Sequence, residues 1–172
     1  MLAELYKRTK LIQSPQIRTF TDDLIACTPE MTWRQPASVY YHPKEEQGEW
    51  GNLIHTIKVD RLGTILADIS KLDTEDCDVL HSACLLHDSC RRGLEAKALK
   101  SVPEHPYLVR RLAEQNKVTC SYADEIFSII ENHMGRWGAK PHYFTTNDGI
   151  SLSYLLHLAD CIVTRYGEVW KP

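Results

Sequence analysis

A histidine followed directly by an aspartate, His87-Asp88, ends the apolar run from Ala83 to Leu86. Further potential metal ligands lie on both sides of this pair, namely His55, His105, His133 and Asp160. A buried carboxylate costs free energy unless a cation accompanies it, so Asp88 and Asp160 each need a positive partner. A divalent ion meets that need, and we expect it to be bound by His55, His87, Asp88 and Asp160.

Three predicted helices bring these ligands together. Apolar residues recur with a helical period over residues 51–70, on the helix that carries His55. Asp73 or Thr74 is expected to cap the next helix, which runs to His87. Asn147 or Asp148 is expected to cap a last helix, from Ile150 to about Arg165, that contains Asp160.

The remaining segments are also predicted to be helical or irregular. Residues 2–27 form one or two helices, and residues 28–49, which contain three prolines, form an irregular packed connection. Glu104-His105-Pro106 opens a helix that runs to Glu114. Ser121 and Asp124 have capping-box spacing ahead of a helix that leads to His133 and ends at Gly135, Gly138 and Pro141. The pattern predicts an all-α bundle of six to eight helices.

Length and composition favour one ordinary globular domain. The chain has 172 residues, of which 43% are hydrophobic and 25% charged, and its net charge is -3. We expect a single domain over 1–172, with an N-terminal helical extension (1–35) and a metal-binding helical core (36–166). The charged N-terminus is not signal-like, no apolar run approaches membrane-spanning length, and the six cysteines form no CxxC pair. We therefore expect a cytoplasmic protein with reduced thiols and no membrane partner.

A histidine on an apolar helix face is more often a hydrogen-bonded core residue than a ligand. Asp160 alone is compatible with an ion pair to Arg165 or Arg61. The joint pattern, with one adjacent His-Asp pair, favours the metal site over these structural alternatives. The other four histidines are interpreted as structural or surface residues: His42, His81, His142 and His157. His157 lies one turn before Asp160 and is a candidate to support that ligand.

The residues quoted above resemble the pattern of the HD superfamily of metal-dependent phosphohydrolases over about residues 40–165. That pattern is a helix-borne histidine, a His-Asp pair after an apolar helix, and a distant aspartate. Leu85-Leu86-His87-Asp88 is similar to the family signature. Residues 40–43 followed by 51–56 are similar to the start of HD domains of the 3′-to-5′ exoribonuclease type. Many members follow the pair with a small residue and a lysine, where this chain has Ser89-Cys90-Arg91.

The resemblance also implies a second metal ion. His105 is similar to the additional histidine of the two-metal HD subgroups, and Asn132-His133 stands where those subgroups carry one or two histidines. In that scheme Asp88 bridges the ions, and His105 with His133 holds the second one. A histidine before a proline at a helix start is also typical of a surface cap. Imidazole and carboxylate ligands suit Fe, Mn, Ni, Co or Zn without selecting among them.

Cationic and aromatic residues near the ligands are candidates for substrate binding. Arg91 and Arg136 are expected to hold phosphate oxygens and to offset charge in the transition state, and Lys58 could point into the same pocket. Arg91 and Arg136 are the better candidates, because glycines keep their loops close to the ligands. Lys58 is equally typical of the helix surface, and Lys97 and Lys100 are more typical of a solvated loop. Trp137 and Tyr143 either stack on a base or pack their loop.

The sequence favours hydrolysis of a phosphomonoester or phosphodiester, in a nucleotide, another phosphorylated small molecule or a short single-stranded nucleic acid. Two alternatives remain open. HD proteins similar to myo-inositol oxygenase use the same ligand set to bind two irons and activate oxygen. A degenerate HD domain would serve as a regulatory module, although the full ligand set argues against that.

Overall fold

The computed structural model describes residues 1–38, 40–143 and 151–166. In these ranges all regular elements are helical, with eight α-helices and two short 3₁₀ turns, so the predicted all-α bundle is confirmed. No helix in the described ranges is long and apolar enough to cross a membrane. The six cysteines are free thiols.

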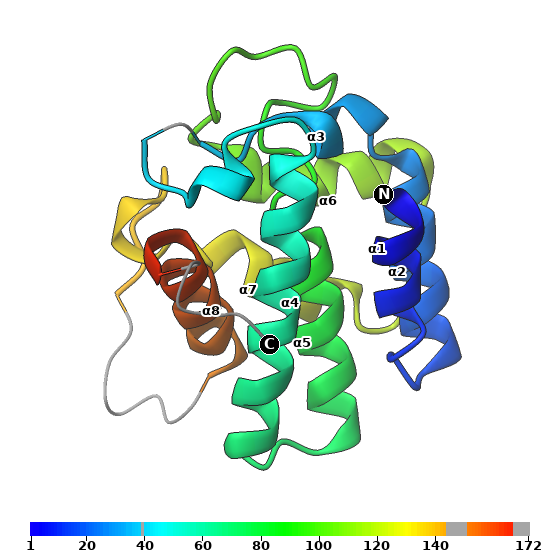
Figure 1. Ribbon diagram of the computed structural model, residues 1–172. Helices are drawn as coiled ribbons and strands as arrows, with labels where there is room; N and C mark the ends of the chain where they lie inside the picture. The colour runs from blue at the N-terminus through cyan, green and yellow to red at the C-terminus, as the bar shows by residue number, and fades with distance from the viewer. Residues whose placement is uncertain (39, 144–150, 167–172) are drawn as a thin grey trace.

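Two antiparallel helices, α4 (Gly51–Ile69) and α5 (Thr74–Leu86), form the centre of the bundle (Figure 1). The chain turns between them at Lys71, whose φ of 55° is left-handed. Asp73 then caps α5 by accepting a hydrogen bond from the backbone N–H of Asp76 at 2.9 Å, as the sequence predicts. Close packing of the pair depends on Gly63, because a Cβ there would lie 2.7 Å from Sγ of Cys84.

The C-terminal half adds α6 (His105–Asn116), α7 (Ala123–Asn132), the 3₁₀ turn η2 (Gly135–Trp137) and α8 (Leu152–Tyr166). Helix α7 packs on α5 and α8, α8 packs on α4, and α6 packs on α7. The predicted capping box of α7 is wrong, because Ser121 donates instead to Oε1 of Gln16 at 3.0 Å and Asp124 pairs with Arg110. The predicted caps of α8, Asn147 and Asp148, lie outside the described residues.

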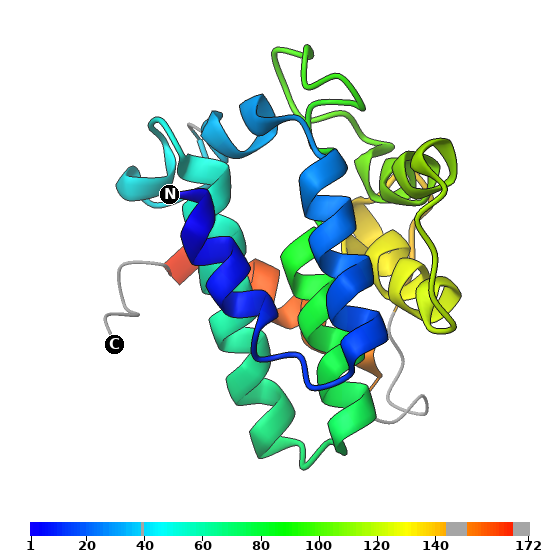
Figure 2. The ribbon, with the colours of Figure 1, turned by 90° about the vertical axis from the view of Figure 1, so that its right-hand side faces the viewer.

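The N-terminal helices α1 (Leu2–Thr9) and α2 (Pro15–Cys27) cover the opposite side of the central pair (Figure 2). Asp78 of α5 fixes the link between them, since its carboxylate accepts hydrogen bonds from the backbone N–H groups of Gln13 and Ser14 at 2.8 and 2.6 Å. The connection to α4 contains the short helix α3 (Glu30–Arg34) and the 3₁₀ turn η1 (Lys44–Glu46).

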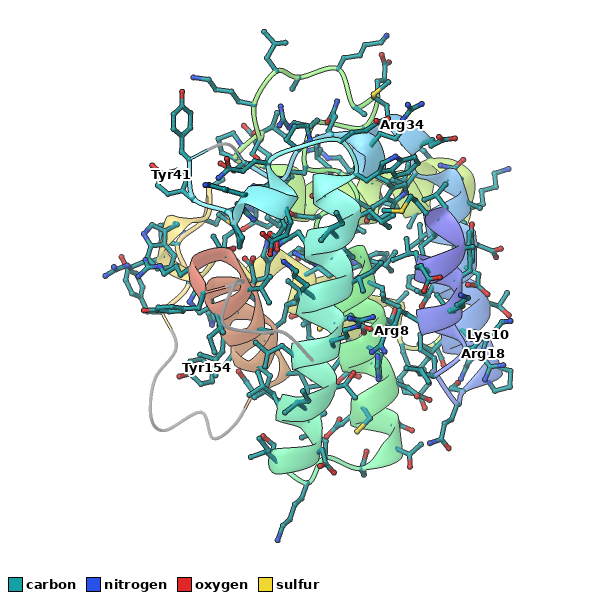
Figure 3. All side chains as sticks on the ribbon, viewed as in Figure 1. Arg8, Lys10, Arg18, Arg34, Tyr41 and Tyr154 are labelled. Carbon is teal, nitrogen blue, oxygen red and sulfur yellow. The ribbon has the colours of Figure 1, made fainter. Side chains whose placement is uncertain are left out.

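A partly buried ion pair joins α1 to the central helices. Figure 3 shows Arg8 reaching from α1 toward α4, where its Nε lies 2.5 Å from Oδ2 of Asp60. The other carboxylate oxygen of Asp60 accepts from Nδ1 of His81 on α5 at 2.7 Å. His81 is therefore a structural residue, in agreement with the sequence-based interpretation.

One hydrophobic core runs through all of these layers. Burying each large apolar side chain contributes about 1.5–3 kcal/mol, which offsets the conformational entropy lost on folding. The largest fully buried side chains come from both halves of the chain: Leu5, Ile12, Ile17, Phe20, Leu24, Trp33, Leu53, Leu80, Leu85, Leu86, Ile126 and Ile130.

Candidate metal centre

The six candidate ligands converge from four helices and one turn. His55 lies in the second turn of α4, and His87-Asp88 forms the turn at the end of α5. The others lie on the surrounding helices: His105 begins α6, His133 ends α7, and Asp160 lies midway along α8. The four histidines and Asp88 are buried, and the side chain of Asp160 is 18% exposed.

His55, His87 and Asp160 form the first group of ligand atoms. One ligand atom from each lies within 4.8 Å of the other two, as shared coordination of an ion requires. Nε2 of His55 is 3.1 Å from Oδ1 of Asp160. The structure therefore brings these three side chains together, as a shared metal site would need.

Asp88, His105 and His133 form a second group with the same spacing. Oδ1 of Asp88 is 3.2 Å from Nε2 of His105, whereas Oδ2 lies 3.9 Å from Nε2 of His55 and 3.8 Å from Nε2 of His87. The two oxygens of one carboxylate thus face the two groups. His105 is buried in this arrangement, unlike the surface cap that the sequence left open.

Hydrogen bonds at Nδ1 fix the orientation of the imidazoles. His87, His105 and His133 each place Nδ1 against a backbone carbonyl, those of Cys84, Val102 and Ile130, at 2.7–2.8 Å. Nδ1 of His55 instead lies 3.2 Å from Oε2 of Glu46. A carbonyl or carboxylate only accepts, so each Nδ1 carries a proton, and each ring turns its Nε2 toward the centre.

The free Nε2 atoms show that a cation suits this site. Nε2 of His55 and Nε2 of His87 are buried and make no hydrogen bond, a costly arrangement in an interior unless another partner binds them. His55 Nε2 lies near Asp160 but lacks hydrogen-bond geometry. Imidazole nitrogens beside carboxylates form the donor set that divalent transition metals prefer, so the residues present fit the ion that the sequence implies.

Electrostatics keep the carboxylates ionised and shift the pKa values of His133 and His55 in opposite directions. Burial opposes charge on Asp88, but Arg91, His87 and His105 outweigh it and hold the pKa of Asp88 well below its usual value. Burial, with His87 and His105 nearby, lowers the pKa of His133 to about 3. His55 differs, because Asp160 and Glu46 outweigh its burial and raise its pKa to about 9.

Arg91 lies directly beside the ligands. Its Nη1 donates to Oδ2 of Asp88 at 2.8 Å, its Nε donates to Oγ of Ser101 at 2.6 Å, and its Nη2 lies 3.4 Å from Nε2 of His42. The guanidinium is thus held by three segments at the edge of the centre. Arg92, by contrast, donates to the carbonyls of Pro36 and Ala98 and anchors its own loop.

The other predicted substrate contacts lie elsewhere. Lys58 is bound by two carboxylates, with Nζ 2.6 Å from Oε1 of Glu45 and 2.8 Å from Oε1 of Glu46. Arg136 is exposed, and its guanidinium lies 4.6 Å from the ring centre of Trp137. Asn132 donates to the carbonyl of Ser128 on the helix surface, so it does not take the place of a second histidine.

The exposed surface around Arg136 is connected to the ligands through Trp137 and His157. Nδ1 of His157 lies 2.6 Å from the backbone oxygen of His133, which places His157 directly behind a ligand. The ring of Trp137 stacks on that of His157 with centroids 5.8 Å apart, and Trp137 is 50% exposed. Tyr41 and Tyr143 are exposed as well, and Figure 3 shows Tyr41 projecting away from the bundle.

His42 and Glu46 are the site residues that the sequence analysis did not identify. His42 was interpreted as structural or surface, yet it is buried, and its Nδ1 lies 2.8 Å from Oε2 of Glu46. Glu46 is fully buried within a run of charged residues that suggests a solvated loop. The one available signal was the i, i+4 spacing of His42 and Glu46 just before the helix of His55.

Comparison with known families agrees with this geometry. Residues 52–164, well over half of the chain, match the HD domain family, and the matched range contains all six candidate ligands. No curated protein and no solved structure matches the chain at a significant level. HD domains bind divalent metals and make up a superfamily of metal-dependent phosphohydrolases. With its ligand order, its helical fold and its paired ligand groups, this chain belongs to the HD domain family.

Proposed function

We propose that this protein is a phosphohydrolase that holds two divalent ions and cleaves a phosphomonoester or phosphodiester. The observation that carries the proposal is the placement of Asp88, whose Oδ1 faces His105 while its Oδ2 faces His55 and His87. A carboxylate in that position can join two ions. Such ions, when bound, activate water as a nucleophile and neutralise phosphoryl oxygens.

The side chains around the ligands would bind and orient the phosphoryl group. Arg91 is the strongest candidate, because its guanidinium is held next to Asp88 and can offer N–H donors to two phosphate oxygens. It would stabilise the charge that develops on those oxygens in the transition state. Arginine stays protonated at neutral pH, so we assign it no role in proton transfer. Arg136 is the second candidate, for a substrate that extends beyond the centre.

A nucleotide or short single-stranded nucleic acid is our proposed substrate class. Trp137 supports it, because its half-exposed ring stacks on His157, which in turn contacts the backbone of the ligand His133. A half-exposed aromatic side chain connected to a ligand in this way is suited to contact a base. Arg136 and Arg165 lie near the same ring, with guanidinium carbons 4.6 and 5.9 Å from its centre.

Hydrolysis of bis-p-nitrophenyl phosphate and of a nucleotide panel tests the proposal. The protein is assayed with manganese, nickel, cobalt, iron or zinc, beside His87→Ala and Asp88→Asn variants whose helical content is checked by circular dichroism. We expect turnover by the wild type and a loss of about 10²–10³-fold in both variants, as when a group acting in the transition state is removed. Equal activity of a folded variant and the wild type would exclude this site.

A di-iron oxygenase is the second candidate, and the complete set of six ligands favours it as much as hydrolysis. Arg91 beside Asp88 would also suit an oxygenase that acts on a phosphonate. Anaerobic purification with iron, followed by exposure to oxygen, separates the two functions. An absorption spectrum that changes with oxygen in step with substrate oxidation would favour the oxygenase, and hydrolysis that is indifferent to oxygen would favour the phosphohydrolase.

A further inference from the structure

His55 is the one ligand histidine whose Nδ1 is held by a side chain. The other three lie at helix ends or just outside a helix, where backbone carbonyls remain available, and each bonds such a carbonyl. His55 lies inside α4, where the helix uses its own carbonyls. The orientation of this ring therefore depends on an acceptor from another segment, and Glu46 supplies it at 3.2 Å.

The backbone is built to bring Glu46 to that position. Gly51, the first residue of α4, has no side chain, and a Cβ there would lie 2.0 Å from the carbonyl oxygen of Glu46. The turn η1 therefore packs directly against the start of α4. The same carbonyl accepts a hydrogen bond from the backbone N–H of Ala37 at 2.9 Å, which ties η1 to the preceding loop.

The charges around Glu46 hold its carboxylate ionised in the interior. Burial alone would favour the protonated form, but His42, His55 and Lys58 outweigh it and lower the pKa of Glu46 to about 2. Oε2 faces Nδ1 of His42 and of His55, while Oε1 binds the ammonium of Lys58 at 2.8 Å. Lys58 thus serves to balance Glu46, a role different from the substrate contact that the sequence suggested.

We propose that Glu46 is a positioning residue that orients His55 toward the metal centre and that, through His42, connects this ligand to Arg91. The inference rests on the proposed metal site. A carboxylate that accepts the Nδ1 proton of a ligand histidine fixes its tautomer and makes Nε2 a better donor. His42 extends the contact, because its Nδ1 donates to Glu46 while its Nε2 lies 3.4 Å from Nη2 of Arg91. Arg91 in turn binds Asp88, so the network joins two ligands from different elements.

Manganese affinity, measured by competition with a chelator, tests this role without using turnover. Glu46→Gln removes the charge at nearly constant shape, and Glu46→Asp keeps the charge but shortens the side chain. We expect both variants to fold and to bind manganese about 10–100-fold more weakly, as when an outer-shell partner is lost. The matched control is Glu45→Gln, since Glu45 also pairs with Lys58 but contacts no histidine. We expect the manganese affinity of Glu45→Gln to stay within about twofold of that of the wild type. This change is smaller than the loss expected when a side chain that orients a ligand is removed.

Imidazole nitrogen NMR of the metal-free protein gives a second readout. We expect a hydrogen-bonded Nδ1 proton on His55 in the wild type and in Glu45→Gln, and its loss in Glu46→Gln. Unchanged affinity in folded Glu46 variants would overturn the positioning role and leave the proposed function intact. Failure of both Glu46 variants to fold would also overturn it, because Glu46 would then be a folding residue. A wild type that binds no manganese would overturn the inference and the proposed function together.

Discussion

The Nε2 atoms of His105 and His133 lie 3.4 Å apart in the interior, although each ring places its Nδ1 against a backbone carbonyl. With the protons on Nδ1, two lone pairs face each other beside the carboxylate of Asp88. Lone pairs repel at that distance unless a proton or a metal ion lies between them. This pair is therefore the clearest reason to expect a second ion.

His105→Ala tests that expectation. The variant removes one ligand of the second group and leaves His55, His87 and Asp160 unchanged. We expect tightly bound metal to fall from two ions per chain to one, as measured by elemental analysis after dialysis. His142→Ala, a histidine outside both ligand groups, is the control and is expected to retain two ions. A His105→Ala protein that still binds two would contradict the assignment.

Metal binding is expected to release a proton from His55. The pKa of His55 is raised to about 9 in the metal-free site, where Asp160 and Glu46 outweigh burial, so the ring is protonated at about pH 7.5. Binding at Nε2 requires the neutral ring. We expect release of about one proton at that pH and none well above pH 9, with metal affinity falling as the pH drops. Calorimetry in buffers of different ionisation enthalpy measures this number, and a value near zero at about pH 7.5 would contradict the prediction.

Gly63 and Cys84 are expected to be coupled. A Cβ at Gly63 would lie 2.7 Å from Sγ of Cys84, so Gly63→Ala should cost about 1–3 kcal/mol through overpacking. Cys84→Ala removes the sulfur, and in that background Gly63→Ala should be neutral or stabilising, because alanine favours a helix by about 1 kcal/mol over glycine. Urea unfolding of the four proteins measures the coupling. Additive changes in the free energy of unfolding would show that the contact between Gly63 and Cys84 does not limit how closely α4 and α5 pack.

Arg8→Met is expected to destabilise the bundle. Asp60 is fully buried and would keep its hydrogen bond with His81 but lose the guanidinium, so we expect a loss of about 2–4 kcal/mol in urea unfolding. Lys7→Met is the matched control on the same helix, because Lys7 pairs with Glu4 at the exposed surface and should contribute nothing measurable. Equal losses of unfolding free energy in the two variants would show that the contact between Arg8 and Asp60 does not stabilise the bundle more than the exposed pair.

Much of this fold is predictable because its helices carry strong local signals. The periodic apolar residues of 51–70 become α4, and Asp73 caps α5 as expected. A local capping pattern fails where a residue distant in the sequence offers another hydrogen-bond partner. Ser121, for example, donates to Gln16 and does not cap α7. The prediction for residues 28–49 was incomplete, since an irregular connection was expected and the segment also contains α3 and η1.

The candidate ligands were predictable because histidine and aspartate are costly on apolar helix faces. Their supporting residues were not. Glu45 and Glu46 are neighbours of the same type, yet one is partly exposed and the other fully buried. The difference arises from the close approach of η1 to Gly51, a contact between backbones that a single sequence does not reveal. The role of Lys58 was missed for the same reason. Its carboxylate partners lie on η1, so it pairs with them instead of pointing into the substrate pocket.

The most direct test of the account is a metal titration of Asp88→Asn beside the wild type. The metal-free proteins are titrated with cobalt, and the bound ions are counted by absorption and elemental analysis. Because each oxygen of Asp88 faces a different histidine group, we expect two ions in the wild type and loss of tight binding at both positions in the variant. A folded Asp88→Asn protein that binds two cobalt ions as tightly as the wild type would contradict it.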